Sequence, residues 1–150
     1  DVSFILRCIR DLASYERSAG EVRATEEDLR QWLFEERIAH CLIAELGGAR
    51  RGFALYFLNF STWEGAPGVY LEDLYVQPEA RGKGLGTALL RYLAALCLEQ
   101  GYTRVEWVCL DWNQPSLDFY HALGAVTRTG WSQLRLDLPA IRRLAEAGPR

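Results

Sequence analysis

Apolar side chains recur at helical spacing in several stretches of the chain, and each stretch is bounded by residues that begin or end helices. The first stretch runs from Phe4 to Glu16, and Gly20 follows it. Thr25 precedes an acidic run, Glu26, Glu27 and Asp28, and this variant of the capping box predicts a second helix with Leu29, Trp32 and Leu33 on one face. Three further helices are predicted, from Leu85 to about Gln100 with Gly101 as its cap, from Pro115 to Gly124, and from near Pro139 onward.

Runs of apolar and aromatic residues between turn residues predict the strands. The expected strands are His40 to Glu45, Gly52 to Phe60, Val69 to Val76, Val105 to Leu110, and a short final one with Trp131, Leu134 and Leu136. Because strand–helix–strand crossovers favour parallel pairing, this order predicts an α/β or α+β fold with a mixed sheet. A length of 150 residues is typical of one domain, which we expect to span residues 1–150.

Composition excludes several classes of function. The net charge is −3, from 17 basic and 20 acidic residues, and no cluster of Lys or Arg predicts nucleic acid as a partner. The four cysteines are widely spaced and show no zinc pattern, so we expect buried reduced thiols and no metal. No apolar run approaches the roughly 20 residues of a membrane span, and no signal-like segment opens the chain. A cytoplasmic protein without a membrane partner is expected.

The glycine-rich turn from Arg81 to Gly86 lies between a predicted strand and a predicted helix. Backbone N–H groups and the helix dipole can hold a pyrophosphate at such a turn. A P-loop would need Ser or Thr after Lys83, where Gly84 stands, and the dinucleotide-binding spacing fails after Gly86. The turn alone predicts an anion site and is equally typical of an ordinary helix cap.

The spacing of Arg81, Gly84 and Gly86 resembles the acetyl-CoA motif of the GNAT superfamily of N-acetyltransferases. The segments Tyr70 to Val76 and Asp111 to Ser116, the latter ahead of Tyr120, are similar to its diamine and thialysine N-acetyltransferase branch. The likeness extends from the first helix to Leu144 and includes residues 15–16, 40–45, 61–63 and 124–125. This agreement is far more specific than the turn alone.

The resemblance implies the GNAT fold with a splayed strand pair, and direct attack of a neutral amine on acetyl-CoA in a ternary complex. Tyr120 matches the phenol that protonates the leaving thiolate, although its helical spacing also fits a core tyrosine. Glu72 matches the carboxylate that takes up the amine proton through water. The cofactor residues implied are Leu74, Tyr75, Val76, Arg81, Gly82, Lys83, Gly84, Leu85, Gly86, Thr87, Asn113, Gln114, Pro115 and Ser116.

The same resemblance implies a cationic acceptor, either a diamine, a polyamine or a thialysine-like amino acid, and a homodimer. Carboxylates and aromatic walls suit ammonium groups. The positions that match acceptor contacts are Tyr15, Glu16, Trp63, Glu72, Asp73, Glu106, Trp107 and Val108. Glu72 and Asp73 are neighbours on a strand, so both can serve one site only if a bulge or the splayed strand redirects one of them.

Two departures from the branch shift the acceptor toward thialysine. Ser61 stands where polyamine-specialised members carry Asp, and Thr129 stands where a substrate-binding Glu is expected. The family's first strand is also missing ahead of the first helix, which we attribute to truncation of the sequence. Two rival functions remain open, acetylation of protein N-termini or lysines, and an acyl-CoA-binding module with weak transfer.

Overall fold

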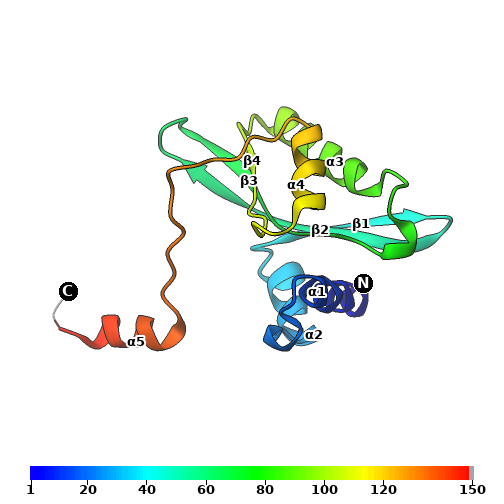
Figure 1. Ribbon diagram of the computed structural model, residues 1–150. Helices are drawn as coiled ribbons and strands as arrows, with labels where there is room; N and C mark the ends of the chain where they lie inside the picture. Colours follow the sequence, from blue (N-terminus) through cyan, green and yellow to red (C-terminus); the bar gives the residue numbers. More distant parts are fainter. Residues whose placement is uncertain (149–150) are drawn as a thin grey trace. The chain divides into compact units, whose positions relative to one another are not determined.

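The computed structural model describes residues 1–148, which form two compact units, Asp1–Leu110 and a second that begins at Asp111 (Figure 1). The first unit contains all four strands and the helices α1 to α3. The second contains α4 and α5. Each unit is described by itself below.

The first unit is built on a mixed four-stranded sheet of order β1-β2-β3-β4. β1 (His40–Leu46), β2 (Ala49–Ser61) and β3 (Ala66–Val76) pair antiparallel through short turns. β4 (Val105–Glu106) pairs parallel to β3 after the helical crossover. The predicted mixed sheet is therefore confirmed, and its parallel pair follows from the crossover as expected.

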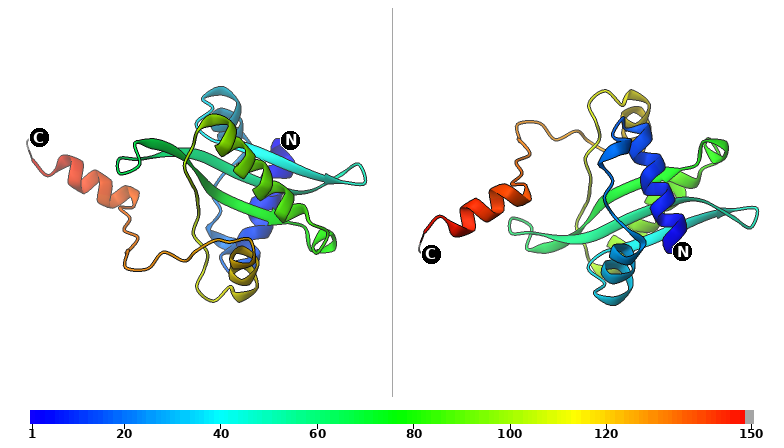
Figure 2. Two further views of the ribbon diagram at one scale, coloured as in Figure 1. Left: turned by 90° about the horizontal axis from the view of Figure 1, so that it is seen from above. Right: turned by 90° about the horizontal axis from the view of Figure 1, so that it is seen from below.

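Helices cover both faces of this sheet (Figures 1 and 2). α1 (Val2–Tyr15) and α2 (Glu26–Arg30), which a π-helical turn Gln31–Glu35 extends, pack on one face. α3 (Leu85–Gln100) packs on the other face, and Gly101 caps it in the left-handed conformation. Alternate residues of β2 divide between the two cores, with Phe53 and Leu55 toward α1 and Ala54 and Tyr56 toward α3.

The capping box that the sequence predicts at the start of α2 is present. The side chain of Thr25 accepts a hydrogen bond from the backbone N–H of Asp28 at 3.1 Å. In return, the Asp28 carboxylate accepts from the backbone N–H of Thr25 at 2.8 Å. Two backbone donors that the helix itself cannot satisfy are paired in this way.

Two strand predictions are wrong. The strand expected over Val105 to Leu110 ends at Glu106, because the β3 pairing stops at the pair Tyr70 and Glu106, just before β3 bulges. The final strand expected around Trp131 is absent from the described residues, and residues 131–137 run without helix or strand. Alternating apolar residues predicted a strand there, yet Leu134 is 90% exposed, and no neighbouring strand pairs with the segment within residues 1–148.

The second unit consists of two helices and the segment between them. α4 (Gln114–Ala122) begins with Pro in its first turn and is followed by Gly124 at a φ of 96°. α5 (Leu138–Glu146) begins after Asp137, whose side chain accepts a hydrogen bond from the backbone N–H of Ala140 at 2.9 Å. Both helices confirm their predicted starts. None of the helices within residues 1–148 is long and apolar enough to cross a membrane.

Candidate active site

A β-bulge in β3 falls at the two neighbouring acids, Glu72 and Asp73. Leu55 of β2 pairs with Asp73, and the next residue, Tyr56, pairs with Leu71, so Glu72 is the extra residue of the bulge. Because cross-strand partners share a face, Asp73 lies on the α1 face with Leu55, whereas Leu71 lies on the α3 face with Tyr56. In a regular strand residues 71 and 73 would share a face. A bulge, one of the two features that could let both acids serve one site, is therefore present at Glu72.

Three carboxylates of the first unit influence one another at this bulge. Burial, together with the charges of Glu72 and Glu16, raises the pKa of Asp73 from 3.8 to about 7. Burial also raises the pKa of Glu16, which follows the last residue of α1. Glu72 is exposed and Asp73 is partly buried. We call Glu16, Glu72 and Asp73 the acidic cluster.

The acidic cluster has no cationic partner within the described part of the chain. The ion pairs found there join other acids, namely Asp1, Glu27, Glu64, Glu79 and Glu106, to arginines. Carboxylates that share a site without a counter-ion raise one another's pKa and attract cations. The cluster is therefore suited to bind an ammonium group.

The tyrosines at positions 15 and 75 lie on either side of an arginine from the glycine-rich turn. The Cζ atom of Arg81 lies 5.3 Å from the ring centroid of Tyr15 and 5.6 Å from that of Tyr75. Its Nε donates to the backbone carbonyl of Val76 at 2.9 Å. The guanidinium thus joins the end of α1, the end of β3 and the turn. The resemblance places Arg81 in the cofactor turn, with charge attraction to phosphate as its side-chain role, and the spacing of the three residues does not indicate the contact with Tyr15 and Tyr75.

The turn itself has the open backbone that an anion site needs. Gly82 and Gly84 adopt φ values of 72° and 83°, and a Cβ built on either would meet no atom within 4 Å. Gly84 is the N-cap of α3, where no described side chain caps the helix. The first N–H groups of a helix have no partner within it, so this end of α3 can donate to a phosphate. Lys83 is exposed beside it, with its Nζ donating to the carbonyl of Glu79 at 3.1 Å.

The edge of β3 after the bulge has no strand beside it. Leu74, Tyr75 and Val76 pair with β2 on one side, through Ala54, Phe53 and Gly52. On the other side, β4 pairs only with Val69 and Tyr70 in the described sheet. A free edge of this kind can pair with an extended amide-containing ligand.

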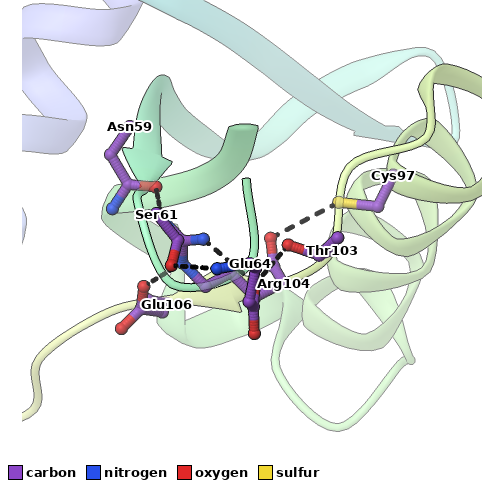
Figure 3. Close-up of polar contacts among 7 residues, drawn as sticks. All are labelled: Asn59, Ser61, Glu64, Cys97, Thr103, Arg104 and Glu106. Atoms are coloured by element: carbon purple, nitrogen blue, oxygen red, sulfur yellow. Dashed lines mark hydrogen bonds and ion pairs between the residues drawn. The ribbon is translucent and has the colours of Figure 1, made fainter. Parts of the chain in front are cut away.

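A polar network around Arg104 holds the β2–β3 hairpin to β4 (Figure 3). Arg104 donates to Asn59 Oδ1 at 2.7 Å and forms ion pairs with Glu64, at 3.3 Å, and with Glu106. Glu64 also accepts from the hydroxyl of Thr103. Of the predicted acceptor residues, Glu106 is thus paired with an arginine already. The sequence argument did not predict this network, since its members are up to 45 residues apart.

Trp63 is not brought to the acidic cluster. It lies in the turn between β2 and β3 and is 85% exposed. Glu72 lies six residue steps along β3 from its first residue, Ala66, which corresponds to about 20 Å along an extended strand. Of the other predicted acceptor residues, Trp107 is half-buried and Val108 is exposed, and both follow the end of β4.

The remaining predicted residues belong to the second unit. Asn113 is buried and caps α4 by accepting a hydrogen bond from the backbone N–H of Ser116 at 3.4 Å. Gln114 and Pro115 form the first turn of the helix. Tyr120 lies in its last turn, half-buried, with its ring 5.4 Å from that of Phe119. Their positions relative to the acidic cluster remain predictions.

Comparison with known proteins gives consistent results. Residues 6–125 match the model of the acetyltransferase (GNAT) family, a match that crosses the boundary between the two units. A thialysine N-epsilon-acetyltransferase of Bos taurus is 40% identical over 157 residues, covering 97% of this chain and 92% of the relative. The enzyme of the same name from Caenorhabditis elegans is 34% identical, covering 95% and 89%. Among solved structures, an integron cassette protein from the mobile metagenome of V. cholerae is similar, with a TM-score of 0.78 and 25% identity, covering 95% of this chain and 90% of its own.

Proposed function

The chain belongs to the acetyltransferase (GNAT) family and is an amine N-acetyltransferase, and from this premise we propose that its acceptor is a small molecule with at least two cationic groups. Acetyl transfer would occur by direct attack of the acceptor amine on acetyl-CoA, with both molecules bound at once. A thialysine-like amino acid, a diamine or a polyamine has the required charge. The relatives named thialysine N-epsilon-acetyltransferase favour the first of these.

The observation that carries this proposal is the acidic cluster. Glu16, Glu72 and Asp73 have no ion-pair partner among the described residues, and the charges of Glu72 and Glu16 help burial to raise the pKa of Asp73 to about 7. A cation bound there would be stabilised by all three charges. A second ammonium group on the acceptor keeps its charge during the reaction and can stay with the cluster while the first is acetylated.

The residues of the turn fit the cofactor that this family uses. The positive φ values of Gly82 and Gly84, the open space above them and the N-terminal end of α3 suit a pyrophosphate. The free edge of β3 at residues 74–76 suits the amides of a pantetheine arm. Bound acetyl-CoA would supply the thioester on which the amine acts. Asn113 to Ser116 are assigned to the same cofactor through the resemblance.

Proton transfer is assigned to two side chains of the chain. Glu72, at the exposed position of the bulge, would accept the amine proton through a water molecule. Tyr120 would donate to the leaving thiolate, as its place in the family motif implies. Asp73 and Glu16 hold the acceptor by charge. Glu72 is assigned the role of the base because, of these three acids, it is the one most open to the water that would carry the proton.

The experiment is a CoA-release assay with spermidine, thialysine, lysine and a short peptide as acceptors. We expect turnover with thialysine above that with spermidine, and little with the peptide. Tyr120→Phe and Glu72→Gln should each lower kcat by about 10²-fold or more. Tyr92→Phe and Glu99→Gln, exposed residues of α3, are matched controls that should leave kcat unchanged. No release with any amine, or turnover of the peptide alone, would contradict the proposal.

We also propose that the protein works as a homodimer in the cytoplasm. Apolar side chains of the second unit are exposed over one continuous stretch and along the amphipathic helix α5, namely Val126, Trp131, Leu134, Leu136, Leu138, Ile141 and Leu144. A second copy is the partner that would cover them. The four free thiols fit a reducing compartment. Sedimentation of the wild type and of Leu134→Ser tests the dimer, which the substitution should weaken.

A further inference from the structure

The guanidinium of Arg81 is held by contacts with the end of α1 and the end of β3. Its planar head lies on the rings of Tyr15 and Tyr75, and its Nε is bonded to the carbonyl of Val76. Among the described residues no carboxylate pairs with it. Cation–π contact and a directed hydrogen bond together specify one position for this side chain. Lys83, two residues on, has no described ring contact and reaches only the carbonyl of Glu79.

The contact with Tyr15 reaches the part of the molecule that holds the acceptor. Tyr15 is the last residue of α1, and the next residue, Glu16, belongs to the acidic cluster. The end of α1 is secured by three backbone hydrogen bonds, from the N–H groups of residues 16, 17 and 18. Because Tyr15 and Glu16 are adjacent at this hydrogen-bonded helix end, a contact that fixes Tyr15 also restricts the backbone that carries the Glu16 carboxylate.

We propose that Arg81 is a positioning residue that couples the cofactor turn to the acceptor site. Its backbone begins the turn between β3 and α3, and its side chain holds the end of α1 against β3. A pyrophosphate bound at the turn would hold the backbone of Arg81, and with it the guanidinium that contacts Tyr15, which precedes Glu16. Acetyl-CoA binding thus prepares the acidic cluster for the amine. This inference rests on the proposed function, and it assigns to the side chain of Arg81 a task other than charge attraction to phosphate.

Steady-state kinetics separate this role from a phosphate contact. We expect Arg81→Met to raise the acceptor KM about tenfold, and the acetyl-CoA KM by less than about threefold, since the backbone of the turn is kept. Arg81→Lys should behave similarly, because a lysine keeps the charge without the planar stack. Lys83→Met, the matched loss of one charge from the same turn, should raise mainly the acetyl-CoA KM. If Arg81→Met raises the acetyl-CoA KM more than the acceptor KM, the proposal is wrong.

Amide hydrogen exchange tests the coupling between the cofactor turn and the end of α1 without relying on acetyl transfer. Addition of CoA should slow exchange of the amides of residues 16–18 in the wild type and in Lys83→Met, and it should have no such effect in Arg81→Met. Tyr15→Leu should remove the effect in the same way, and combining it with Arg81→Met should add nothing further. An unchanged CoA effect in Arg81→Met overturns the inference. If no amine is acetylated but this exchange pattern holds, the proposed function fails and the coupling stands.

Discussion

Replacement of Asp73 by Asn should stabilise the folded protein at pH 8. The carboxyl of Asp73 lies on the α1 face beside Glu72 and Glu16, and its pKa is raised from 3.8 to about 7, first by burial and then by those two charges. Asparagine has nearly the same shape and carries no charge. The substitution therefore removes the unfavourable charge and leaves the bulge in place.

The magnitude follows from the two pKa values. Below about pH 4 both the folded and the unfolded protein hold the Asp73 proton, and the charge contributes nothing to stability. Between pH 4 and 7 the unfolded chain ionises while the folded protein keeps its proton, so stability falls by about 1.4 kcal/mol per pH unit. Above pH 7 the loss is complete and constant, at about 4 kcal/mol for a shift of roughly three units. Water near this partly exposed group reduces the loss, and we expect about 1–3 kcal/mol.

Urea unfolding at pH 5 and at pH 8 is the assay. The free energy of unfolding of Asp73→Asn should exceed that of the wild type at pH 8, and the excess should shrink by at least about 1 kcal/mol at pH 5. Glu16→Gln should show a difference of the same sign, because burial raises the pKa of Glu16 too. The same substitutions should weaken binding of a cationic acceptor. An excess that is equal at the two pH values, or a less stable Asp73→Asn at pH 8, would refute the reasoning.

Two further predictions concern the scaffold and are measured by the same urea unfolding. Gly52→Ala should lower the free energy of unfolding by about 1–3 kcal/mol, because its Cβ would lie 2.7 Å from the carbonyl oxygen of Tyr75. Gly20→Ala is the control, and it should change the free energy of unfolding little because a Cβ at Gly20 would meet no atom within 4 Å. Thr25→Ala should lower it by about 1 kcal/mol through loss of the capping box, and Thr25→Ser should restore most of that. Equal changes in the free energy of unfolding at the two glycines would contradict the close approach of Gly52 to the Tyr75 carbonyl. No change for Thr25→Ala would contradict the contribution of the capping box.

Local sequence signals predicted most of the elements of the first unit. The helical spacing after Phe4, the capping box at Thr25 and the glycine at position 101 each depend on neighbours within a few residues, and each is confirmed. The strand around Trp131 shows the limit of this reasoning. Alternation of apolar residues favours a strand, but a strand also needs a partner that supplies hydrogen bonds, and alternation does not identify one.

The sequence predicts the types of residue in the candidate site better than it predicts how they are arranged in space. Glu72 and Asp73 were recognised as acids, and the need for a bulge was stated, but only pairing with β2 shows that the bulge falls at Glu72. The ion pairs of Arg104 and the stacking of Arg81 link residues far apart in the chain. Such contacts depend on the tertiary fold, which a single sequence does not reveal through spacing. The ion pair of Glu106 with Arg104 is one such contact, and the role of Glu106 toward the acceptor stays a prediction.

Some acids of the chain form ion pairs with arginine, whereas those of the acidic cluster do not. We interpret the first group as structural and the second as functional. Glu64 and Glu106 share one arginine, which holds the hairpin to β4 and neutralises part of their charge. Glu16, Glu72 and Asp73 have no ion-pair partner in the described residues, and the folded protein loses stability at neutral pH by keeping them together. An arginine at this bulge would remove that loss and would also occupy the place of a cationic acceptor. If the proposed acceptor site is correct, a bound amine supplies the missing positive charge, and the stabilisation of the protein by amines at pH 8 should exceed that at pH 5.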